Sequence, residues 1–274
     1  MRRPISTTGG RSQRMVPPTE SQEVRVGGFY DGLARDFDRM TAFDQRLVSE
    51  RPFYRLLVEH HRIATALDAG AGTGFHSILL SMLGVQVTAV DLSPAMLEAL
   101  EHRASEQGLA ITSLQSSFRE LPARFRGPVD AVVCMGNTLA HTLTDDELLQ
   151  TLAMFRSLIN PGGVLLVQVL NFDRILADRE SVQSIRESDG ITYMRAYDFR
   201  DDHLVFNVRI IDQRGATVEE RHSSMPLKPW TSQHLMRQTT AAGFCNVKAY
   251  GSIALDRFTP ASSKDLVLVA QNRS

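Results

Sequence analysis

Short apolar runs alternate with helix-like stretches through the first two thirds of the chain. The apolar runs are rich in Val, Ile and Leu and lie at residues 64–69, 85–90, 111–115, 129–135 and 163–170. Residues 43–60, 94–106 and 145–158 instead carry apolar residues at the spacing of an amphipathic helix. Strands with nearly unbroken apolar runs are typical of a parallel sheet that helices cover on both faces. We therefore predict a doubly wound α/β domain.

Beyond Asn171 the pattern changes to alternating apolar and polar positions. Residues 191–199, 203–212 and 216–224 alternate in this way and are separated by polar turns, which predicts antiparallel strands. A helix at 232–242 and strands at 246–250 and 265–270 then complete the first sheet. The predicted fold is a mostly parallel, seven-stranded Rossmann-like sheet at 25–172 and 230–274, with an inserted antiparallel β cap at 173–229.

The first residues differ from the rest of the chain. Four arginines, three prolines and no acidic residue precede Glu20. Such a composition fits a transit peptide, but the few apolar residues form no amphipathic face, so we predict a disordered tail over residues 1–24.

Charge and composition exclude several kinds of partner. The 274 residues include 30 basic and 31 acidic side chains, a net charge of -1, which argues against nucleic acid and anionic membranes. No apolar run approaches the ~20 residues of a membrane span. Two cysteines favour a reducing, cytoplasmic compartment. We predict a small-molecule partner and no metal site; nothing in the sequence decides for or against a homo-oligomer.

The stretch "ALDAGAGTGFHSILL" places three glycines directly after the first predicted strand. In an open parallel sheet the first such turn is the usual ligand cradle, and glycine allows a ligand to approach the main chain. Phe75 and His76 stand where a phosphate-binding P-loop has Lys and Ser or Thr. A nucleoside triphosphate is therefore not the predicted ligand.

Two acidic residues indicate which class of ligand the glycine turn binds. Asp68 precedes the glycines, where it would repel the pyrophosphate of a dinucleotide but would suit an ammonium group, directly or through a water. Asp91 ends the second predicted strand, where a carboxylate can accept both hydroxyls of a ribose. A dinucleotide-dependent oxidoreductase stays open as an alternative, which the spacing of the turn disfavours.

Three segments carry a family resemblance. "LDAGAGTG", "VTAVDLSPAML" and "LINPGGVLLV" resemble, in order, the glycine turn, the ribose acid and the fifth strand of class I S-adenosylmethionine-dependent methyltransferases. "FDRM", "VVCMGNTLAH" and "LNFDRIL" look like glycine N-methyltransferase and the glycine/sarcosine methyltransferases. The resemblance implies S-adenosylmethionine as cofactor and S-adenosylhomocysteine as product.

The resemblance also implies site residues. Tyr30 would close over the cofactor, Arg46 would reach its carboxylate, and Met135 would contact the adenine, while Asn137, Thr138 and His141 would lie near the sulfonium or the acceptor. Asn137 and His141 are the predicted catalytic residues. The predicted cofactor-binding residues are Tyr30, Arg46, Asp68, Ala69, Gly70, Gly72, Gly74, Asp91, Leu92, Met96, Ser117, Phe118, Met135, Gly136 and His141.

The sequence departs from the family pattern at two positions. Ser117 stands where many members carry an acid for the adenine amino group; a hydroxyl can make that hydrogen bond, but more weakly. Leu170 stands where the glycine methyltransferases place an arginine for the substrate carboxylate. Because leucine cannot pair with a carboxylate, glycine is a poor candidate for the acceptor.

The predicted cap supplies most of the candidate substrate residues. Arg195 and Tyr197 lie two apart on one strand and so share a face. The predicted substrate residues are Asn171, Arg195, Tyr197, His222 and Trp230. We predict a methyltransferase that acts on a small molecule, with nitrogen favoured over oxygen by resemblance. A small-molecule O-methyltransferase and a non-catalytic S-adenosylmethionine-binding protein of the same fold are the alternatives.

Overall fold

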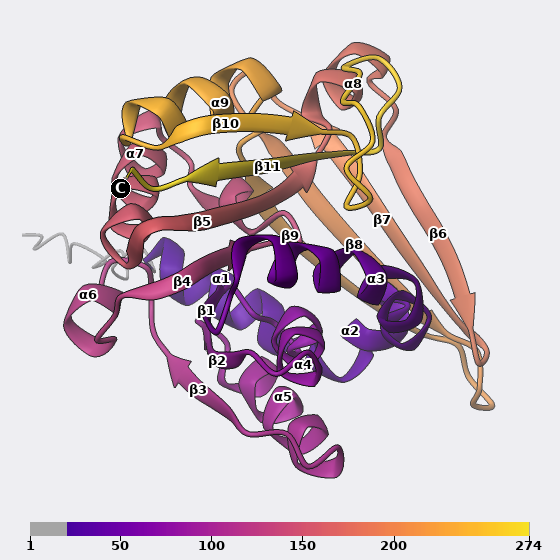
Figure 1. The fold of residues 1–274 in the computed structure, drawn as a ribbon. Coiled ribbons are helices and arrows are strands. Elements are labelled where there is room, and N and C mark those ends of the chain that lie inside the picture. Colours follow the sequence, from indigo (N-terminus) through magenta and orange to yellow (C-terminus); the bar gives the residue numbers. More distant parts are fainter. Residues whose placement is uncertain (1–20, 274) are drawn as a thin grey trace, which may run out of the picture.

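The computed structural model describes residues 21–273, which form two β-sheets and the helices around them (Figure 1). The strands are β1 (Thr65–Ala69), β2 (Gln86–Asp91), β3 (Ile111–Gln115), β4 (Val129–Cys134), β5 (Ile159–Leu170), β6 (Val182–Ser188), β7 (Ile191–Phe199), β8 (Leu204–Asp212), β9 (Glu219–Leu227), β10 (Cys245–Tyr250) and β11 (Asp265–Gln271). The helices are α1 (Gln22–Asp31), α2 (Ala34–Thr41), α3 (Phe43–His61), α4 (Phe75–Met82), α5 (Pro94–Glu106), α6 (Leu121–Arg124), η1 (Thr138–His141), α7 (Asp145–Ser157), α8 (Phe172–Asp178) and α9 (Ser232–Ala241).

The first sheet has seven strands in the order β10-β11-β5-β4-β1-β2-β3. Strands β1 to β5 pair in parallel, whereas β11 pairs antiparallel with β5 and with β10. The inner strand β1 is buried on both faces at Ala66 and Leu67, as an unbroken apolar run requires. This confirms the predicted doubly wound, mostly parallel sheet.

Helices cover both faces of this sheet. One apolar core joins α3 and α4 to one face, and a second joins α7 and α9 to the other. Local signals set the helix ends: Ser93 caps α5 through its Oγ, which accepts from Met96 N at 3.1 Å. Thr144 and Glu147 form a capping box at the start of α7. The core positions the carboxyl ends of the strands along one edge.

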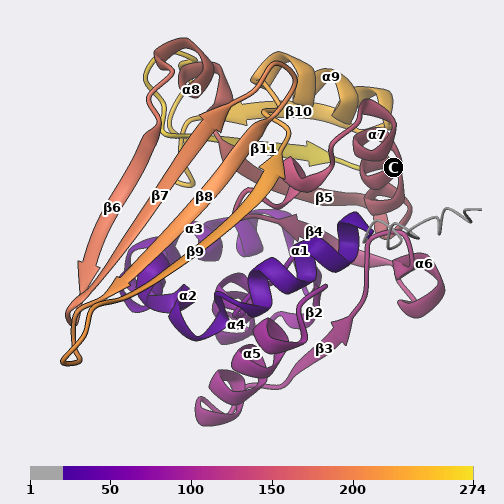
Figure 2. The ribbon, with the colours of Figure 1, turned by 180° about the vertical axis from the view of Figure 1, so that it is seen from behind.

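The second sheet is antiparallel, in the order β6-β7-β8-β9, and is inserted between β5 and α9. Figure 2 shows it beside α1 and α2. Its inner face packs on these helices through Ile191, Tyr193 and Val208, against Phe29 and Leu33. These strands lie within the predicted cap, although its first residues form helix α8, its last strand begins at Glu219, and β6 was not predicted.

The buried carboxylate of Asp36 ties α2 to this sheet. It accepts from Arg221 Nη2 at 2.6 Å, from Arg35 Nε at 3.3 Å and from the Tyr193 hydroxyl at 3.3 Å. Burial alone would raise the pKa of Asp36, but hydrogen bonds from Arg221 and Arg35 hold it below its ordinary value. Helix α2 and the second sheet are therefore held together over the carboxyl-end edge of the first sheet.

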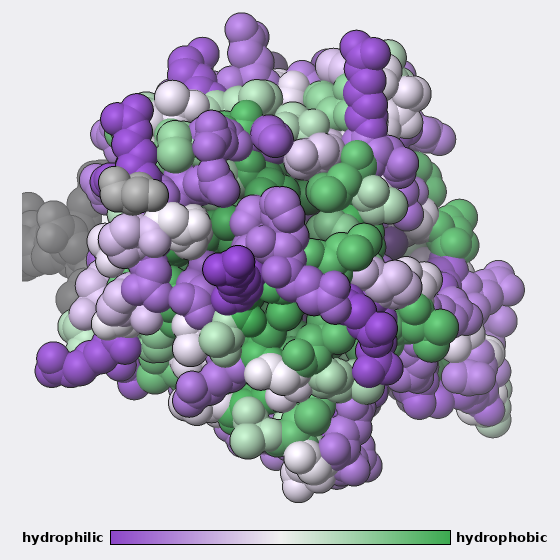
Figure 3. All heavy atoms as spheres, in the orientation of Figure 1, coloured by the Kyte–Doolittle hydropathy of each residue, from purple (hydrophilic) through white to green (hydrophobic). Residues whose placement is uncertain are grey.

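Residues 1–20 of the predicted tail lie outside the described residues. Residues 22–24 instead begin helix α1, capped by Ser21, so the prediction placed the end of the tail too far along the chain. Figure 3 shows hydrophilic side chains spread over the visible face between hydrophobic ones. Within residues 21–273, no helix is both long and apolar enough to cross a membrane.

Candidate functional site

A cavity of about 1160 Å³ lies between the carboxyl ends of the parallel strands and the second sheet. This is the edge of an open α/β sheet where ligands bind. The cavity is larger than the roughly 300–1,000 Å³ of a site for one small ligand, so it has room for two reactants. Its walls come from the ends of β1, β2, β4 and β5, from α1 and α2, and from Arg195, Tyr197 and Phe206 of the second sheet.

The three glycines of the first turn all adopt positive φ, at 79° for Gly70, 55° for Gly72 and 87° for Gly74. They serve different purposes. A Cβ at Gly70 would lie 2.4 Å from Thr138 Cγ2, and one at Gly74 would lie 2.4 Å from Leu100 Cγ. These two glycines permit close packing beneath the turn. Gly72 lines the cavity, where its bare backbone leaves room for a ligand.

Asp91 lies at the end of β2 and lines the cavity. Its Oδ2 accepts from Gly72 N at 2.8 Å and its Oδ1 from Ser93 N at 2.9 Å. A carboxylate has about four lone-pair positions, so each oxygen keeps one for a further donor. Burial raises the pKa of Asp91, and the hydrogen bonds from Ser93 and Gly72 oppose that shift. The arrangement suits a pair of neighbouring hydroxyls.

Asp68 is fully buried and does not line the cavity. The alternation of β1 turns its side chain toward α4, where its Oδ2 accepts from Ser77 Oγ at 2.6 Å. Its Oδ1 is buried without a hydrogen-bond partner among the described residues. The expected direct contact with an ammonium group therefore finds no support here. Ala69, Gly74 and Met96, also predicted to bind the cofactor, lie outside the cavity lining as well.

The buried Asp68 carboxyl gives a pH-dependent stability. Burial raises its pKa to about 7, above the ~3.9 of an unfolded chain. The folded state thus binds this proton more tightly than the unfolded chain does. The contribution of Asp68 to the free energy of unfolding therefore falls as the pH rises from about 4 to about 7. We expect Asp68→Asn to flatten this dependence in urea unfolding at pH 5, 6, 7 and 8.

Asp130→Asn is the control for this measurement. Hydrogen bonds from Ala64 and Asn160 outweigh burial and hold the pKa of Asp130 below its usual value, so its effect lies at lower pH. An unchanged pH dependence in Asp68→Asn would contradict the assignment. Calorimetry in two buffers measures proton release when S-adenosylhomocysteine binds. Such a release would indicate that the bound ammonium group, bridged to Asp68 by a water, lowers the pKa of Asp68.

Tyr30 and His141 meet over the cavity. The Tyr30 hydroxyl lies 2.8 Å from His141 Nε2, and the two rings meet edge to face at 5.5 Å between centroids. Burial lowers the pKa of His141 to about 4, so its ring is neutral at pH 7. Its Nδ1 is buried with no partner among residues 21–273. The geometry makes His141 a fixed support for Tyr30.

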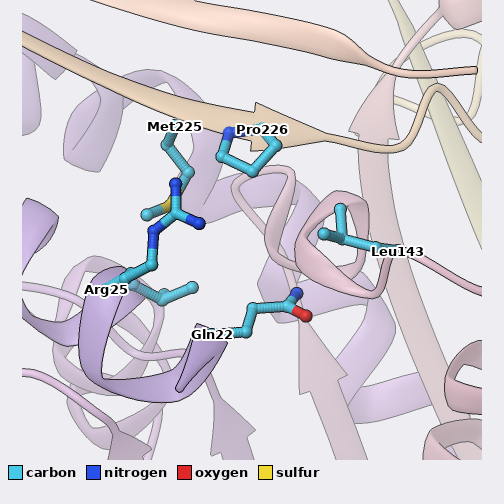
Figure 4. A pocket seen from close by; sticks show the side chains of 6 residues that line it. Gln22, Arg25, Leu143, Met225 and Pro226 are labelled. Carbon is cyan, nitrogen blue, oxygen red and sulfur yellow. The ribbon is translucent and has the colours of Figure 1, made fainter. Parts of the chain in front are cut away.

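A small cavity of about 230 Å³ adjoins the start of α1 (Figure 4). Gln22 and Arg25 line it from α1, Met225 and Pro226 from β9, and Leu143 from the segment before α7. The Gln22 side-chain amide also donates to the carbonyl oxygen of His141. The beginning of α1 is thus held against the segment that carries His141.

The segment after β4 lines the cavity from Met135 to Thr138. Asn137 adopts a positive φ of 71°, and its Oδ1 accepts from Leu170 N at 3.1 Å. Gly136 N donates to Gln168 Oε1 at 2.8 Å, and Gln168 Nε2 donates to Asp265 Oδ1 at 2.8 Å. These bonds fix the segment on β5, with Asn137 at the surface of the cavity.

The remaining predicted cofactor residues lie on two sides of the cavity. Leu92, Ser117 and Phe118 line it beyond the ends of β2 and β3. Ser117 is buried, and its Oγ accepts from Glu120 N at 3.3 Å. On the opposite side, Arg46 lies 4.0 Å above the centroid of the Phe75 ring and donates to Glu50 Oε1 at 2.6 Å. Its Nη2 also donates to Glu50 Oε2, at 3.4 Å, so the N–H groups that Glu50 does not engage are left for a ligand.

Of the predicted substrate residues, Arg195 and Tyr197 line the cavity and three others do not. Asn171 is buried, with Nδ2 donating to Pro260 O and Ser263 O. Trp230 is also buried, and its Nε1 donates to Leu139 O at 3.1 Å. His222 is exposed, because the alternation of β9 turns Arg221 inward and His222 outward. The substrate role expected for these three residues therefore gains no support from the cavity lining.

Several cavity residues were not predicted from the sequence. They are Phe37, Glu50, His76, Gln168, Arg174, Arg186, Lys264 and Asp265. Gln168 and Asp265 face each other across adjacent strands that are far apart in sequence. Arg186 lies on β6, whose polar composition gives no strand signal. Polar residues inside the apolar run of β5 were the one signal that could have identified Gln168.

Comparison with known proteins decides the family. Residues 66–163 match a family described as a methyltransferase domain. The chain is 33% identical over 191 residues to glycine/sarcosine N-methyltransferase from Halorhodospira halochloris, covering 65% of this chain and 71% of that protein. It belongs to the S-adenosylmethionine-dependent methyltransferases.

Two further comparisons extend over most of the chain. Glycine/sarcosine N-methyltransferase from Aphanothece halophytica is 28% identical over 235 residues, covering 84% of this chain and 86% of that protein. The solved S-adenosylmethionine-dependent methyltransferase from Clostridium acetobutylicum ATCC 824 superposes with a TM-score of 0.77 at 15% identity, covering 89% of this chain and 99% of that one. The last similarity concerns the fold.

The site has the features that the family's cofactor requires. Asp91 has two acceptor positions left for a ribose diol, and Gly72 exposes bare backbone beside it. The first turn of α4 follows with no side-chain cap at Gly74, so the amide groups of Phe75 and His76 are left for a ligand, while the Ser77 amide donates to Asp68. The observed donor and acceptor pattern therefore fits S-adenosylmethionine at the first turn.

Proposed function

We propose that this methyltransferase transfers a methyl group from S-adenosylmethionine to a nitrogen atom of a small molecule. The observation that carries the proposal is the similarity to glycine/sarcosine N-methyltransferases, at 33% identity over 191 residues, whose named acceptors are amines. The cavity supports it, because Asn137 lines the same cavity as the glycine turn and the cap residues Arg195 and Tyr197.

The residues that line the cavity have distinct proposed roles. Asp91 would bind the ribose hydroxyls, Gly72 would contact the cofactor through its main chain, and Tyr30 would cover it from α1. Leu92, Ser117, Phe118 and Met135 would surround the adenine. Arg46 keeps N–H groups that would reach the carboxylate. Gly70 and Gly136 would shape the backbone on either side.

S-adenosylmethionine supplies a methyl group that its sulfonium charge already activates. The acceptor nitrogen forms a bond to the methyl carbon as the carbon–sulfur bond breaks, and the electron pair of that bond stays with sulfur. The protein's main contribution is therefore to hold the reactants in line and to exclude water. Asn137 and the supported Tyr30 hydroxyl are the groups placed to orient the acceptor, which must arrive as a neutral amine.

Glycine itself fits this cavity poorly. Leu170 lines the cavity at the position where the family resemblance implies an arginine for the carboxylate of glycine. Its side chain cannot donate a hydrogen bond, and an unpaired carboxylate against it would be costly. We therefore propose an acceptor other than glycine.

The proposal is tested by calorimetry and by a methylation screen. We expect the purified full chain to bind S-adenosylhomocysteine and to methylate members of a panel of amines, with the methyl group on nitrogen by mass spectrometry. Methylation of phenols alone would overturn transfer to nitrogen. Failure to bind S-adenosylhomocysteine would overturn the cofactor assignment.

A further inference from the structure

Two arginines of the cap line the cavity without an acidic partner among the described residues. They are Arg186 on β6 and Arg195 on β7. Arg195 Nε donates to Ser184 Oγ at 2.7 Å, while Arg186 Nε is buried and has no hydrogen-bond partner within residues 21–273. Most of the donors of both guanidinium groups are therefore available to a ligand.

The register of the sheet brings these two side chains together. Arg195 pairs with Ser184 and Arg186 pairs with Tyr193. The two arginines thus lie on the same face and are diagonal neighbours on adjacent strands, at a separation of about 7–8 Å that long side chains can bridge. Two guanidinium forks on this face can approach one anion.

The other cavity cations differ from this pair. Arg46 is paired with Glu50, Arg174 lies 3.6 Å from Asp178, and Arg119 lies 3.9 Å from Glu23. Lys264 lies next to Asp265, whose pKa burial raises and the nearby cations lower. Burial lowers the pKa of Arg195, and the positive charges of Arg186 and Arg46 lower it further, against an opposing effect of Tyr197. A protein that holds like charges together in this way gains from an anion between them.

We propose that Arg186 and Arg195 bind an anionic group of the methyl acceptor, a carboxylate or a phosphate. The proposal rests on the proposed function, since it concerns the molecule that receives the methyl group. It moves the anion site from the end of β5, where Leu170 has no charge, to the inner face of the cap. The acceptor is then an amine that reaches from Asn137 to the second sheet.

A matched series of amines tests this inference. The probes are glycine, β-alanine, 4-aminobutanoate and 5-aminopentanoate, the amide of each, and the aminoalkyl phosphonate of each length. Methyl transfer is followed by S-adenosylhomocysteine formation, and binding to the S-adenosylhomocysteine complex by calorimetry. We expect each productive anion to exceed its amide by about 100-fold in kcat/KM or affinity, since losing both charge-assisted contacts costs about 3 kcal/mol.

The variants Arg186→Met and Arg195→Met then connect this preference to the pair. We expect each to raise KM for the anionic amine by at least tenfold, with a smaller change in kcat, and to reduce the preference for the anion over its amide. Arg186→Lys and Arg195→Lys should retain part of the preference for the anion over its amide. The control is Arg209→Met, which removes an outer-face arginine of β8 that pairs with Glu220 and should leave all values unchanged.

Each outcome decides one point. A preference for phosphonates identifies a phosphate, and a preference for carboxylates identifies a carboxylate. Two results would overturn the anion site. One is that the neutral amides equal their acids in kcat/KM and affinity. The other is that no anion binds the S-adenosylhomocysteine complex at 10 mM, a Kd that corresponds to a binding free energy of about 2.7 kcal/mol. Loss of S-adenosylhomocysteine binding in Arg186→Met or Arg195→Met would assign the pair to the cofactor carboxylate instead. Failure of the wild type to bind S-adenosylhomocysteine at all would reject the proposed function first.

Discussion

Replacing Asp91 with alanine should weaken cofactor binding by about 100-fold or more while the fold persists. The carboxylate lines the cavity and keeps two acceptor positions beyond its bonds to Gly72 N and Ser93 N. Two hydrogen bonds to a charged acceptor are worth about 3 kcal/mol or more, which is roughly 100-fold in Kd. Calorimetry with S-adenosylhomocysteine measures the loss, and circular dichroism with urea unfolding measures the fold.

Asp130→Ala is the matched control for Asp91→Ala. Asp130 also accepts backbone N–H groups, from Ala64 at 3.0 Å and Thr65 at 2.9 Å, but it lies at the start of β1 and β4, at the opposite edge of the sheet. It should lower stability without changing the Kd. Asp91→Asn keeps one acceptor oxygen and should lie between alanine and the wild type. Undiminished affinity in Asp91→Ala would remove Asp91 from the cofactor site.

The sheet could be predicted because its strands carry their own signal. Residues 111–115 are β3 and residues 191–199 are β7, and the helix at 94–106 is α5. The inner parallel strands β1 and β4 are buried on both faces, so an apolar run identifies them, whereas β3 is a half-exposed edge strand. The capping residues Ser93 and Thr144 then fixed the helix starts locally.

The elements that close the cavity carried a weaker signal. Strand β6 is an edge strand with few buried residues, so its sequence lacks the alternation that identifies β7. Helices α1 and α2 depend on contacts with the cap, such as Asp36 with Arg221 across 185 positions of sequence. No local pattern contains a contact of that kind.

The same distinction applies to the site. The glycine turn and Asp91 follow from local sequence, because strand, turn and helix succeed one another along the chain. The direction of a single cap side chain depends on the register, which places Arg221 inward and His222 outward. Trp230 was a candidate because it directly follows the predicted cap, but its Nε1 donates to Leu139 O.

Gly74→Ala should cause a large loss of stability. Gly74 has a φ of 87°, and an added Cβ would lie 2.4 Å from Leu100 Cγ. The left-handed backbone costs about 1–2 kcal/mol, and overpacking against a buried leucine adds about 1–3 kcal/mol. Urea unfolding should therefore show a loss of about 2–5 kcal/mol.

Gly84 separates the two causes, because its φ of 85° is nearly the same and a Cβ there meets nothing within 4 Å. Gly84→Ala should lose about 1–2 kcal/mol, the backbone cost alone. Leu100→Ala makes space beside Gly74, so the double variant Gly74→Ala with Leu100→Ala should lose less than the sum of the single losses, by about 1 kcal/mol or more. Gly74→Ala and Gly84→Ala could instead lose the same free energy of unfolding, and the losses of Gly74→Ala and Leu100→Ala could add in the double variant. These two results together would show that the turn shifts to accommodate the added methyl group. A positive coupling would instead establish that Gly74 is required for the close packing of the glycine turn on Leu100 of α5.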